Sequence, residues 1–481
     1  MVGLITNCKP FFGDLCDEIR LFIVEKRIEE AEEAGEGLFI RVFLQENSGK
    51  WHADCEVILD GKTVCSFQSG VPEETGGALC IKKMKKRFIK NALYSLLRRY
   101  TGVKPPWGSL TGIRPTKLVR ELVAEMGKGA KDFFTAEFDV DESKAKLAFD
   151  IAQNQLPVIK EIKPDDLDIY VGIPFCVSRC SYCSFGSHEL KKNRKITGQY
   201  LDALTREIEG AKRLAEGRRV RCIYIGGGTP TALSEEELQR LFGVLQNAFP
   251  TCREFTVEAG RPDTMDANKL AAIRQAEATR ICVNAQTTNA ETLQRIGRTY
   301  EAGEFGRAFR LVREHGFDFV NTDIILGLPG ETLEDVQKTL EDVCAFDPEN
   351  VTVHTLAVKN AANLTLEDSA TFAGAGAVSR MVDFSREFLE SRGYIPYYLY
   401  RQKYMAGNLE NVGYAKPGKL CLYNIDIMEE LADNLSFGAG AMSKRIFAAE
   451  KRIERSCNIK EVNQYMERLD EMIRRKFELF G

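Results

Sequence analysis

The sequence lacks the features of a membrane-spanning or secreted protein. It has no run of about 20 apolar residues, so we expect no membrane span. Its start, Met-Val-Gly-Leu-Ile-Thr-Asn-Cys-Lys, has no basic segment followed by an apolar run, so we expect no secretory signal peptide. It contains no low-complexity segment and no internal repeat longer than a strand–helix unit. A net charge of −4 at pH 7 gives no overall attraction to nucleic acid, so we expect no nucleic-acid partner.

What is present is typical of a large globular protein. The chain has 481 residues, of which 44% are hydrophobic and 28% charged, which predicts two or three domains. The 14 cysteines do not indicate a disulfide scaffold, because the chain is long and most of its cysteines are scattered among apolar residues. Cys222, Cys282 and Cys344 are expected to be small core residues in a reducing cytosol. We therefore expect a cytoplasmic location.

Three cysteines stand apart from the rest. Cys176, Cys180 and Cys183 form the spacing Cys-x3-Cys-x2-Cys in the run Ile-Pro-Phe-Cys-Val-Ser-Arg-Cys-Ser-Tyr-Cys. Three thiolates at such spacing can hold three irons of a cubane cluster and leave the fourth iron open for chemistry. The alternative is a structural zinc site, which needs a fourth ligand from a second Cys-x2-Cys or a His pair. None follows at such spacing, so the pattern favours a catalytic iron–sulfur cluster.

The strand–helix rhythm predicts three parts. Residues 1–165 are expected to form an α+β domain, with strands over 38–44 and 55–67, the second broken by the Asp60-Gly61 turn. From residue 168, short apolar strands alternate with amphipathic helices, which predicts a parallel sheet curled as a partial or full α/β barrel over residues 166–392. Residues 393–481 form a third part that ends in a charged helix over 458–480. The expected barrel strands are 168–173, 220–225, 254–259, 280–284, 319–325 and 351–355.

Two helix starts in the barrel carry clear signals, and one N-terminal helix is strongly basic. Ser234 and Glu237 form a capping box, and another helix should begin near Thr332. The helix over 82–100 has an apolar face and a face of eight Lys and Arg residues. Such a face is usually solvated; a membrane-surface or RNA role is the alternative.

Polar residues stand at four strand ends in order. Gly226-Gly-Gly-Thr-Pro230 follows the second strand, and its glycines could offer free N–H groups to a carboxylate or ribose. Glu258 ends the third strand, Gln286 follows the fourth, and Asp323 lies in the fifth. Each alone is typical of a helix cap or a polar residue at the core edge. Together, beside an open cluster, they predict a binding site at the carboxyl ends of the strands.

These motifs carry a family resemblance. Ile-Pro-Phe-Cys, Gly-Gly-Gly-Thr-Pro-Thr and Asp-Ile-Ile-Leu-Gly-Leu-Pro-Gly resemble the radical S-adenosylmethionine (SAM) enzymes, and within them the oxygen-independent coproporphyrinogen III oxidase (coproporphyrinogen dehydrogenase) family. The resemblance runs from about residue 170 to residue 443, and Leu-Thr-Gly-Ile-Arg-Pro-Thr-Lys ahead of it is similar to the HemZ-like branch. It implies a partial (β/α)6 barrel, with residues 393–481 covering the substrate cleft.

The resemblance also implies a role for individual residues. Cys176, Cys180 and Cys183 would bind a [4Fe-4S] cluster, and the remaining positions would bind one or two SAM molecules. Met442 matches a contact to a second SAM, and Arg298 an arginine that binds a SAM carboxylate. The other matching positions are Tyr170, Tyr182 beside the adenine, the loop Gly227, Gly228 and Thr229 at the methionine end, Glu258, Gln286, Asp323 and Ala357.

The reaction implied is the oxidative decarboxylation of two coproporphyrinogen III propionates to vinyl groups, giving protoporphyrinogen IX in haem biosynthesis. One electron from a donor such as flavodoxin or ferredoxin would cleave SAM, and the resulting 5′-deoxyadenosyl radical would take a hydrogen from the propionate. Carbon dioxide would then leave, and an electron acceptor would take the surplus electron. Such a tetrapyrrole calls for cations around an aromatic cleft, so we expect Arg401 or Lys403 to meet a propionate. The alternative for this tyrosine-rich segment is packing at an interface.

Two departures from the family pattern leave alternatives open. The characterised oxidases have a cysteine where this chain has Phe185, and a histidine where it has Gly172. Relatives with Phe at the first position include haem chaperones, so a haem-binding chaperone is the first alternative. A radical SAM enzyme acting on another substrate such as RNA is the second. His188, five residues past the cluster, is a candidate axial or acid–base group.

Overall fold

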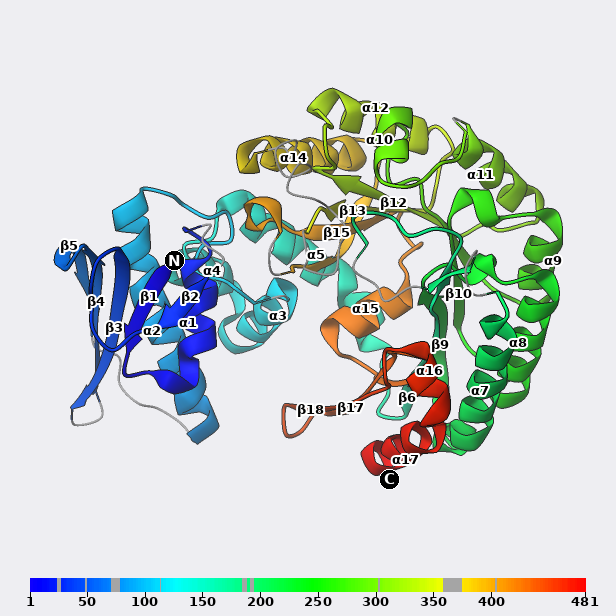
Figure 1. The fold of residues 1–481 in the computed structure, drawn as a ribbon, viewed down its shortest axis with the longest axis horizontal. Coiled ribbons are helices and arrows are strands. Elements are labelled where there is room, and N and C mark those ends of the chain that lie inside the picture. Colours follow the sequence, from blue (N-terminus) through cyan, green and yellow to red (C-terminus); the bar gives the residue numbers. More distant parts are fainter. Residues whose placement is uncertain are drawn as a thin grey trace. The chain divides into compact units, whose positions relative to one another are not determined.

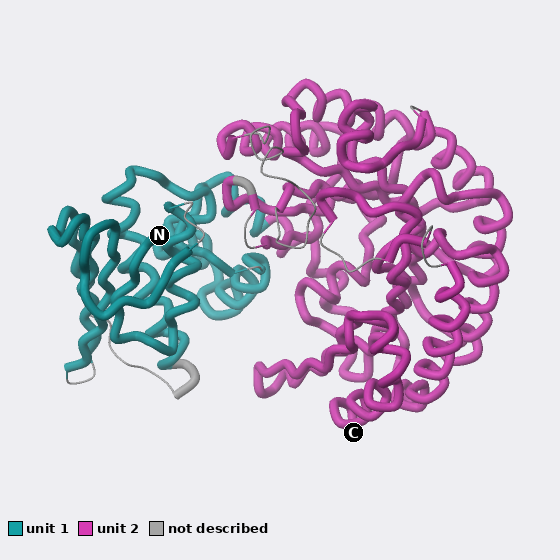
Figure 2. The backbone as a smooth tube through the Cα atoms, in the orientation of Figure 1, with its two compact units in different colours: residues 1–149 teal, residues 150–481 magenta. Residues whose placement is uncertain are grey.

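The chain divides into two compact units. A computed structural model describes residues 1–23, 27–47, 50–70, 78–112, 114–183, 188–190, 194–301, 303–357, 374–402 and 405–481. The units comprise residues 1–149 and 150–481 (Figure 2), and their boundary falls inside helix α5 (Glu142–Lys160). The three-part division with boundaries at residues 165 and 392 stays a prediction.

The first unit is an α+β domain built on a five-stranded sheet. The strand order is β2-β1-β3-β4-β5, with β1–β3 parallel and the β3–β4 and β4–β5 pairs antiparallel. The predicted strands are confirmed, and Asp60 and Gly61 form the turn between β4 and β5, both with positive φ. The elements are β1 (Val2–Thr6), α1 (Phe12–Ile19), β2 (Ile28–Glu30), β3 (Leu38–Asn47), β4 (Lys50–Leu59), β5 (Lys62–Gln68), α2 (Ala78–Thr101), α3 (Pro115–Met126) and α4 (Ala130–Phe138).

Helix α2 is the predicted basic helix, and much of its charge is balanced inside the unit. Its apolar side packs into the core, with Ile89, Leu93 and Leu97 fully buried. On the other side, Lys85 pairs with Glu46, Lys86 with Asp14, Lys90 with Glu18 and Arg98 with Asp139. Half of the eight cations therefore have an acidic partner, which favours a structural role for this face over RNA binding.

The second unit is built on an eleven-stranded sheet whose centre is parallel. Each of six strands pairs with the next one in the sequence, in the order β6-β9-β10-β11-β12-β13. All six predicted barrel strands are confirmed, with bounds within two residues of those expected. The strands are β6 (Asp166–Ile173), β9 (Arg219–Gly227), β10 (Glu254–Gly260), β11 (Arg280–Val283), β12 (Val320–Leu326) and β13 (Asn350–Thr355).

Amphipathic helices connect these strands and lie along the outside of the sheet (Figure 1). The capping box of Ser234 and Glu237 starts α8, and Thr332 caps α12 in a second box with Asp335, so both predicted starts are confirmed. The helices are α7 (Ile196–Ala211), α8 (Glu235–Ala248), α9 (Ala267–Gln275), α10 (Ala290–Arg295), α11 (Glu304–Glu314), α12 (Leu333–Cys344) and α14 (Ala375–Ser391).

The C-terminal residues extend this sheet at both edges. Strand β15 (Asn411–Ala415) lies antiparallel to β13, and β14 (Ile395–Tyr400) lies beyond it. At the other edge β16 (Asp433–Phe437) runs parallel to β6, followed by the β17 (Met442–Phe447) and β18 (Arg452–Cys457) hairpin. In the described part of the chain, β6 therefore does not pair with β13, and the six strands form the predicted open, partial barrel.

The predicted single helix over residues 458–480 is wrong. The structure has two helices, α16 (Val462–Glu467) and α17 (Leu469–Phe480), separated at Arg468. The first starts late because the Glu461 side chain accepts hydrogen bonds from two backbone amides and fixes the helix start there. Asn458 instead bonds to Glu207 and Lys476 in a buried network.

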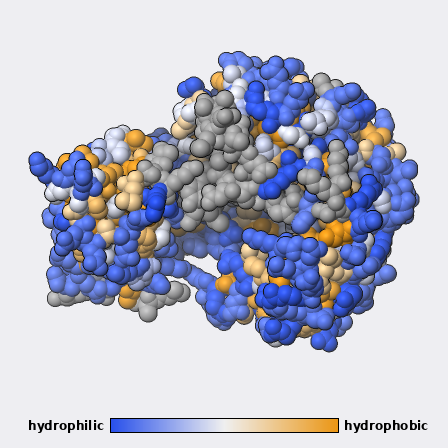
Figure 3. All heavy atoms as spheres, viewed as in Figure 1, coloured by the Kyte–Doolittle hydropathy of each residue, from blue (hydrophilic) through white to orange (hydrophobic). Residues whose placement is uncertain are grey.

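The described helices include none that is both long and apolar enough to cross a membrane. On the face seen in Figure 3, hydrophilic residues cover most of the surface and hydrophobic residues form small separate patches.

Candidate active site

One cavity of about 410 Å³ lies in the second unit, and it collects nearly all of the predicted site residues. Its lining runs from the cysteine loop and the carboxyl ends of the barrel strands along the strands to Arg280, at the start of β11. Met442 does not line it; this residue lies on β17 and its side chain is 40% exposed. The 13 predicted residues that do line it are Tyr170, Cys176, Cys180, Tyr182, Cys183, Gly227, Gly228, Thr229, Glu258, Gln286, Arg298, Asp323 and Ala357.

The cysteine loop is held by the segment that follows α10. The Ser181 amide donates to the Ile296 carbonyl at 3.1 Å, and the Ser178 hydroxyl donates to the Gly297 carbonyl at 3.2 Å. Buried Arg261 donates to the Ser178 hydroxyl at 2.7 Å. Gly297 has a φ of +80°, and a Cβ there would lie 3.2 Å from the Arg179 carbonyl oxygen. The loop that carries the three thiols is thus fixed from a distant part of the sequence.

The glycine loop after β9 packs against the residues that lead from β6 into the cysteine loop. The Gly228 amide donates to the Ile173 carbonyl at 2.8 Å, and the Thr229 amide donates to the Phe175 carbonyl at 2.7 Å. The expectation that the glycine amides are free for a ligand is therefore wrong for Gly228, whose amide anchors the loop together with that of Thr229. A Cβ on Gly228 would lie 2.5 Å from the Phe175 oxygen, so only glycine allows this approach. The Thr229 hydroxyl lies 3.5 Å from the Cys176 sulfur and donates to it.

Glu258 lies in the cavity as a buried carboxyl with a tyrosine partner. The Tyr224 hydroxyl, on the neighbouring strand β9, donates to it. Burial is the main reason that the pKa of Glu258 is raised to about 7, and the nearby charge of Asp323 adds to the rise. A carboxyl with this pKa can hold or release a proton near neutral pH.

Asp323 has the opposite electrostatic setting. Asn321 donates to one of its oxygens at 2.8 Å, and the His354 Nε2 lies 3.7 Å from the other. Burial would raise the pKa of Asp323, but His354 and the hydrogen bonds outweigh burial and lower it. The His354 Nδ1 lies 3.2 Å from the Tyr400 hydroxyl on β14. The pKa values of the two cavity carboxyls are thus shifted in opposite directions, which favours the protonated acid at Glu258 and the carboxylate at Asp323.

Polar atoms without protein partners mark the part of the cavity around Gln286. Gln286 has a φ of +64°, fixed by its amide donating to the Asp323 carbonyl and its carbonyl accepting from the Ile325 amide. Arg298 donates through Nη1 to the Asn284 carbonyl at 2.6 Å. Among the described residues, the Gln286 side-chain oxygen, the Arg298 Nε and the Asn284 side-chain oxygen have no hydrogen-bond partner. These buried groups fit a polar ligand with both donors and acceptors.

Aromatic rings form the remaining walls. Tyr170 stacks with Tyr224 and Tyr423, and the Tyr224 and Tyr423 ring centroids are 4.4 Å apart. Tyr182 packs against the apolar cluster that contains Ile296 and Leu328. These flat surfaces suit a planar heterocycle such as an adenine.

Sequence reasoning missed several lining residues, among them Tyr224 and His354, whereas Tyr398 and Tyr400 belong to the tyrosine-rich segment proposed for the substrate cleft. A signal for them exists in the alternation of strands: Thr352 and His354 are two residues apart, as are Tyr398 and Tyr400. Residues two apart in a strand face the same side, so the residues two before and two after a strand's known site position could have been tested.

Three other sequence hypotheses have different outcomes. Arg401 is buried, donates to the Asn408 carbonyl at 2.9 Å and does not line the cavity, so it is not placed to meet a substrate there. Lys403 and Phe185 lie outside the described residues. His188 is half-buried in the short strand β8 (His188–Glu189), which pairs with β7 (Phe175–Cys176), and it does not line the cavity.

The residues present fit an iron–sulfur cluster with SAM. The Cys triplet lies beside unpartnered polar atoms and aromatic walls in one cavity, which matches a charged amino acid joined to a nucleoside. In the described part of the chain, the ligand atoms of Asp168, Cys222 and Asp426 lie within 4.8 Å of one another. The sulfur atoms of Cys176, Cys180 and Cys183 do not form such a group. The triplet is therefore not gathered around a single-ion point, which favours a larger cluster over zinc.

Comparisons with known proteins agree with this geometry. The Radical SAM superfamily model matches residues 170–343. The chain is 38% identical over 398 residues to the oxygen-independent coproporphyrinogen-III oxidase-like protein HemZ of Bacillus subtilis, covering 81% of this chain and 79% of that protein. It is 29% identical over 315 residues to the haem chaperone HemW of Escherichia coli, covering 64% and 77%.

A solved structure shares the fold. Coproporphyrinogen III oxidase (HemN) of Escherichia coli, described as a radical SAM enzyme, superposes with a TM-score of 0.54 at 24% identity, over 67% of this chain and 73% of that one. The chain therefore belongs to the radical SAM superfamily, in the HemZ-like branch of the oxygen-independent coproporphyrinogen III oxidase family.

Proposed function

We propose that this protein is a radical SAM oxidoreductase that converts coproporphyrinogen III propionates to vinyl groups without oxygen. The observation that carries the proposal is the cavity itself, in which the Cys triplet, the unpartnered Gln286 and Arg298 atoms and the Glu258–Tyr224 pair lie together. The names of the similar proteins support a tetrapyrrole as the substrate.

The roles of the residues follow from their contacts. Cys176, Cys180 and Cys183 would hold the cluster, and the Thr229 hydroxyl would tune it through its hydrogen bond to the Cys176 sulfur. The Gln286 side-chain oxygen and the Arg298 Nε, which have no partner among the described residues, would bind the polar groups of SAM. Cluster and SAM together supply a carbon-centred radical; the protein orients the reactants and excludes water.

The far side of the cavity would receive the substrate propionate. His354, Tyr398 and Tyr400 offer hydrogen-bonding groups there, and Gln402 and Asn411 add two amides. Such groups can orient a carboxylate without the cost of burying an unpaired cation. Among the lining cations, Arg261 is bound to Asp263 and Arg280 to Glu254, so neither needs the substrate for charge balance.

The test is an anaerobic assay of the reconstituted full chain with coproporphyrinogen III, SAM and dithionite. Methionine release and product mass are measured in the same samples. We expect methionine together with products that have lost one and two carboxyl groups. His354→Gln, which keeps a hydrogen-bonding side chain of similar size, should lose product formation more than methionine release. Methionine release with an unchanged porphyrin mass would overturn the proposal while keeping SAM cleavage.

A second candidate is a haem chaperone, and one observation favours it. At Gly172, where the oxidases have histidine, a Cβ would lie 3.5 Å from the Phe437 carbonyl oxygen and 3.7 Å from that of Ala439. This position faces the backbone of the loop after β16, and the glycine there offers no imidazole to a substrate. A Soret band with stoichiometric haem in the assay protein, combined with unchanged coproporphyrinogen, would favour the chaperone.

A further inference from the structure

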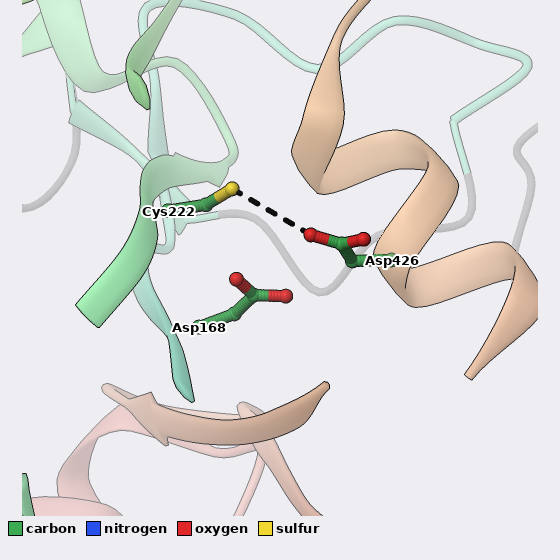
Figure 4. Close-up of side chains that lie close together, drawn as sticks. All are labelled: Asp168, Cys222 and Asp426. Atoms are coloured by element: carbon green, nitrogen blue, oxygen red, sulfur yellow. Dashed lines mark hydrogen bonds between the residues drawn. The ribbon is translucent and has the colours of Figure 1, made fainter. Parts of the chain in front are cut away.

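A second polar cluster is buried at the other end of the barrel strands. Asp168 lies on β6, Cys222 on the adjacent strand β9, and Asp426 on α15 (Leu422–Glu429), which covers this end (Figure 4). All three residues are fully buried, with an exposed fraction of 0%. One ligand atom of each lies within 4.8 Å of the other two, and the three side chains point toward one another in Figure 4.

The hydrogen bonds of this cluster do not balance. In the part of the chain that the structure describes, neither carboxylate oxygen of Asp168 accepts a hydrogen bond from an N–H or O–H group. Asp426 Oδ2 accepts from the Arg221 Nε at 2.7 Å, but Asp426 Oδ1 has no such donor. The Cys222 thiol carries a single proton, and its sulfur lies 3.8 Å from Asp426 Oδ2. A fully buried carboxylate without a partner is costly, so a further positive group is called for.

The surroundings supply a further ligand atom but little positive charge. Asn434 on β16 is the register partner of Asp168, and its buried side-chain oxygen also has no partner among the described residues. Arg221 is the charged partner of the set, since it forms a buried ion pair with Asp426. One guanidinium faces two carboxyl groups, so without a second positive group burial raises the pKa of Asp168 and keeps it protonated.

We propose that Asp168, Cys222 and Asp426 bind a divalent cation of borderline softness, with Zn²⁺ as the representative ion. A thiolate with two carboxylates is a donor set for such an ion, and oxygen-only ions such as Mg²⁺ do not select it. On binding, the Cys222 thiol and the Asp168 carboxyl lose their protons to solvent and the sulfur bonds to the metal. Three negative ligands, Arg221 and a doubly charged cation then sum to zero.

The site would serve stability. Asp168 and Cys222 lie in the amino-terminal halves of their strands, whereas the cysteine loop follows the carboxyl end of β6. In α/β barrels the amino-terminal face carries stability and the opposite face carries chemistry. A metal here would tie α15, late in the sequence, to the first two barrel strands.

Metal analysis of the full chain with its cluster tests the proposal. We expect about one zinc per chain besides the cluster iron, falling to below about a tenth in Asp168→Asn and in Cys222→Ser. Cys344→Ser, a half-buried cysteine on α12, is the matched control and should keep the zinc. The X-ray absorption fine structure above the zinc edge should show one sulfur at about 2.3 Å and oxygens at about 2.0 Å from the zinc. One sulfur per zinc distinguishes this site from zinc bound by the three cysteines of the triplet.

Thermal unfolding tests the site even if the purified protein has lost its metal, because the ion can be added back. Added Zn²⁺ should raise the Tm of metal-stripped wild-type protein and leave that of Asp168→Asn unchanged. Two results would overturn the proposal: zinc retained in both variants, or a zinc-free wild type in which Asp168→Asn has an equal or higher Tm. The second result would mean that the two carboxyls share a proton, since an amide replaces a protonated carboxyl without loss.

Discussion

The two ends of the barrel strands bury their carboxyl groups in opposite ways. At the carboxyl ends, Glu258 accepts a hydrogen bond from Tyr224, and Asp323 accepts one from Asn321 and faces His354. At the amino ends, Asp168 is fully buried and accepts no N–H or O–H hydrogen bond from the described residues. The first arrangement is complete within the protein, and the second requires a proton or a cation.

This difference separates chemistry from stability along the same strands. The partnered carboxyls line the cavity of the Cys triplet, where fixed donors can orient a ligand at little reorganisation cost. The unpartnered one lies under α15, where a bound ion or a proton would hold elements together. Substitutions at the two ends should therefore change different measurements.

The largest expected effect is at the carboxyl end, in Cys180→Ser. Because a serine hydroxyl is a poor iron ligand, iron per chain should fall and SAM cleavage should drop by at least about 100-fold. Cys344→Ser should keep both. Undiminished cleavage in Cys180→Ser would remove the triplet from the chemistry and break the comparison.

At the amino end, Asp426→Asn should affect stability instead. It leaves the Arg221 guanidinium buried without its ionic partner, which is expected to lower the free energy of unfolding by about 3–5 kcal/mol. The Kd for SAM, measured by calorimetry, should stay unchanged because Asp426 does not line the cavity. Weakened SAM binding with normal denaturant unfolding would reverse the assigned roles.

Glu258→Gln should change how stability depends on pH. The pKa of Glu258 is raised from 4.5 to about 7 by burial, so the folded protein holds this proton more tightly than the unfolded chain does. Its stabilising contribution is present at low pH and is lost as the pH rises from 4.5 through about 7. Relative to wild type, the variant should gain about 2–3 kcal/mol between pH 5 and pH 8, seen as Tm against pH. Parallel Tm curves would show that Glu258 titrates normally.

The smallest effect is expected for Thr229→Val, which removes the hydroxyl that donates to the Cys176 sulfur. Losing a hydrogen bond of about 1 kcal/mol to a thiolate ligand should lower the one-electron potential of the cluster by about 40 mV. Thr231→Val is the control, because its hydroxyl donates to the Ala259 carbonyl instead. An equal potential in both variants, in an EPR-monitored titration, would contradict the tuning role.

Much of the barrel could be predicted because its strands are short buried runs bounded by turn signals. The capping box at Ser234 predicted one helix start, and the start expected near Thr332, after Gly327-Leu-Pro-Gly330, proved to carry a second box. The expected helix over residues 458–480 failed for a tertiary reason: Asn458 is drawn into a buried network with Glu207 and Lys476, which no local pattern reveals.

The candidate site divides in the same way. Glu258 and Gln286 could be predicted because each stands at a strand end, and parallel strands bring such ends together, whereas Asp323 lies inside β12 and was matched by the family resemblance. The Asp168 cluster could not, because Asp426 is separated from Cys222 by more than half of the second unit in sequence and approaches it only through the docking of α15. The pairing of Asp323 with His354 likewise depends on the register of β12 and β13.

The most direct test of the proposed function counts carbon dioxide against SAM cleavage. Coproporphyrinogen III labelled in its propionate carboxyl groups is incubated anaerobically with the reconstituted chain, SAM and a reductant. The account predicts one labelled carbon dioxide for each 5′-deoxyadenosine formed, abolished in Cys180→Ser. Formation of 5′-deoxyadenosine without labelled carbon dioxide would contradict it.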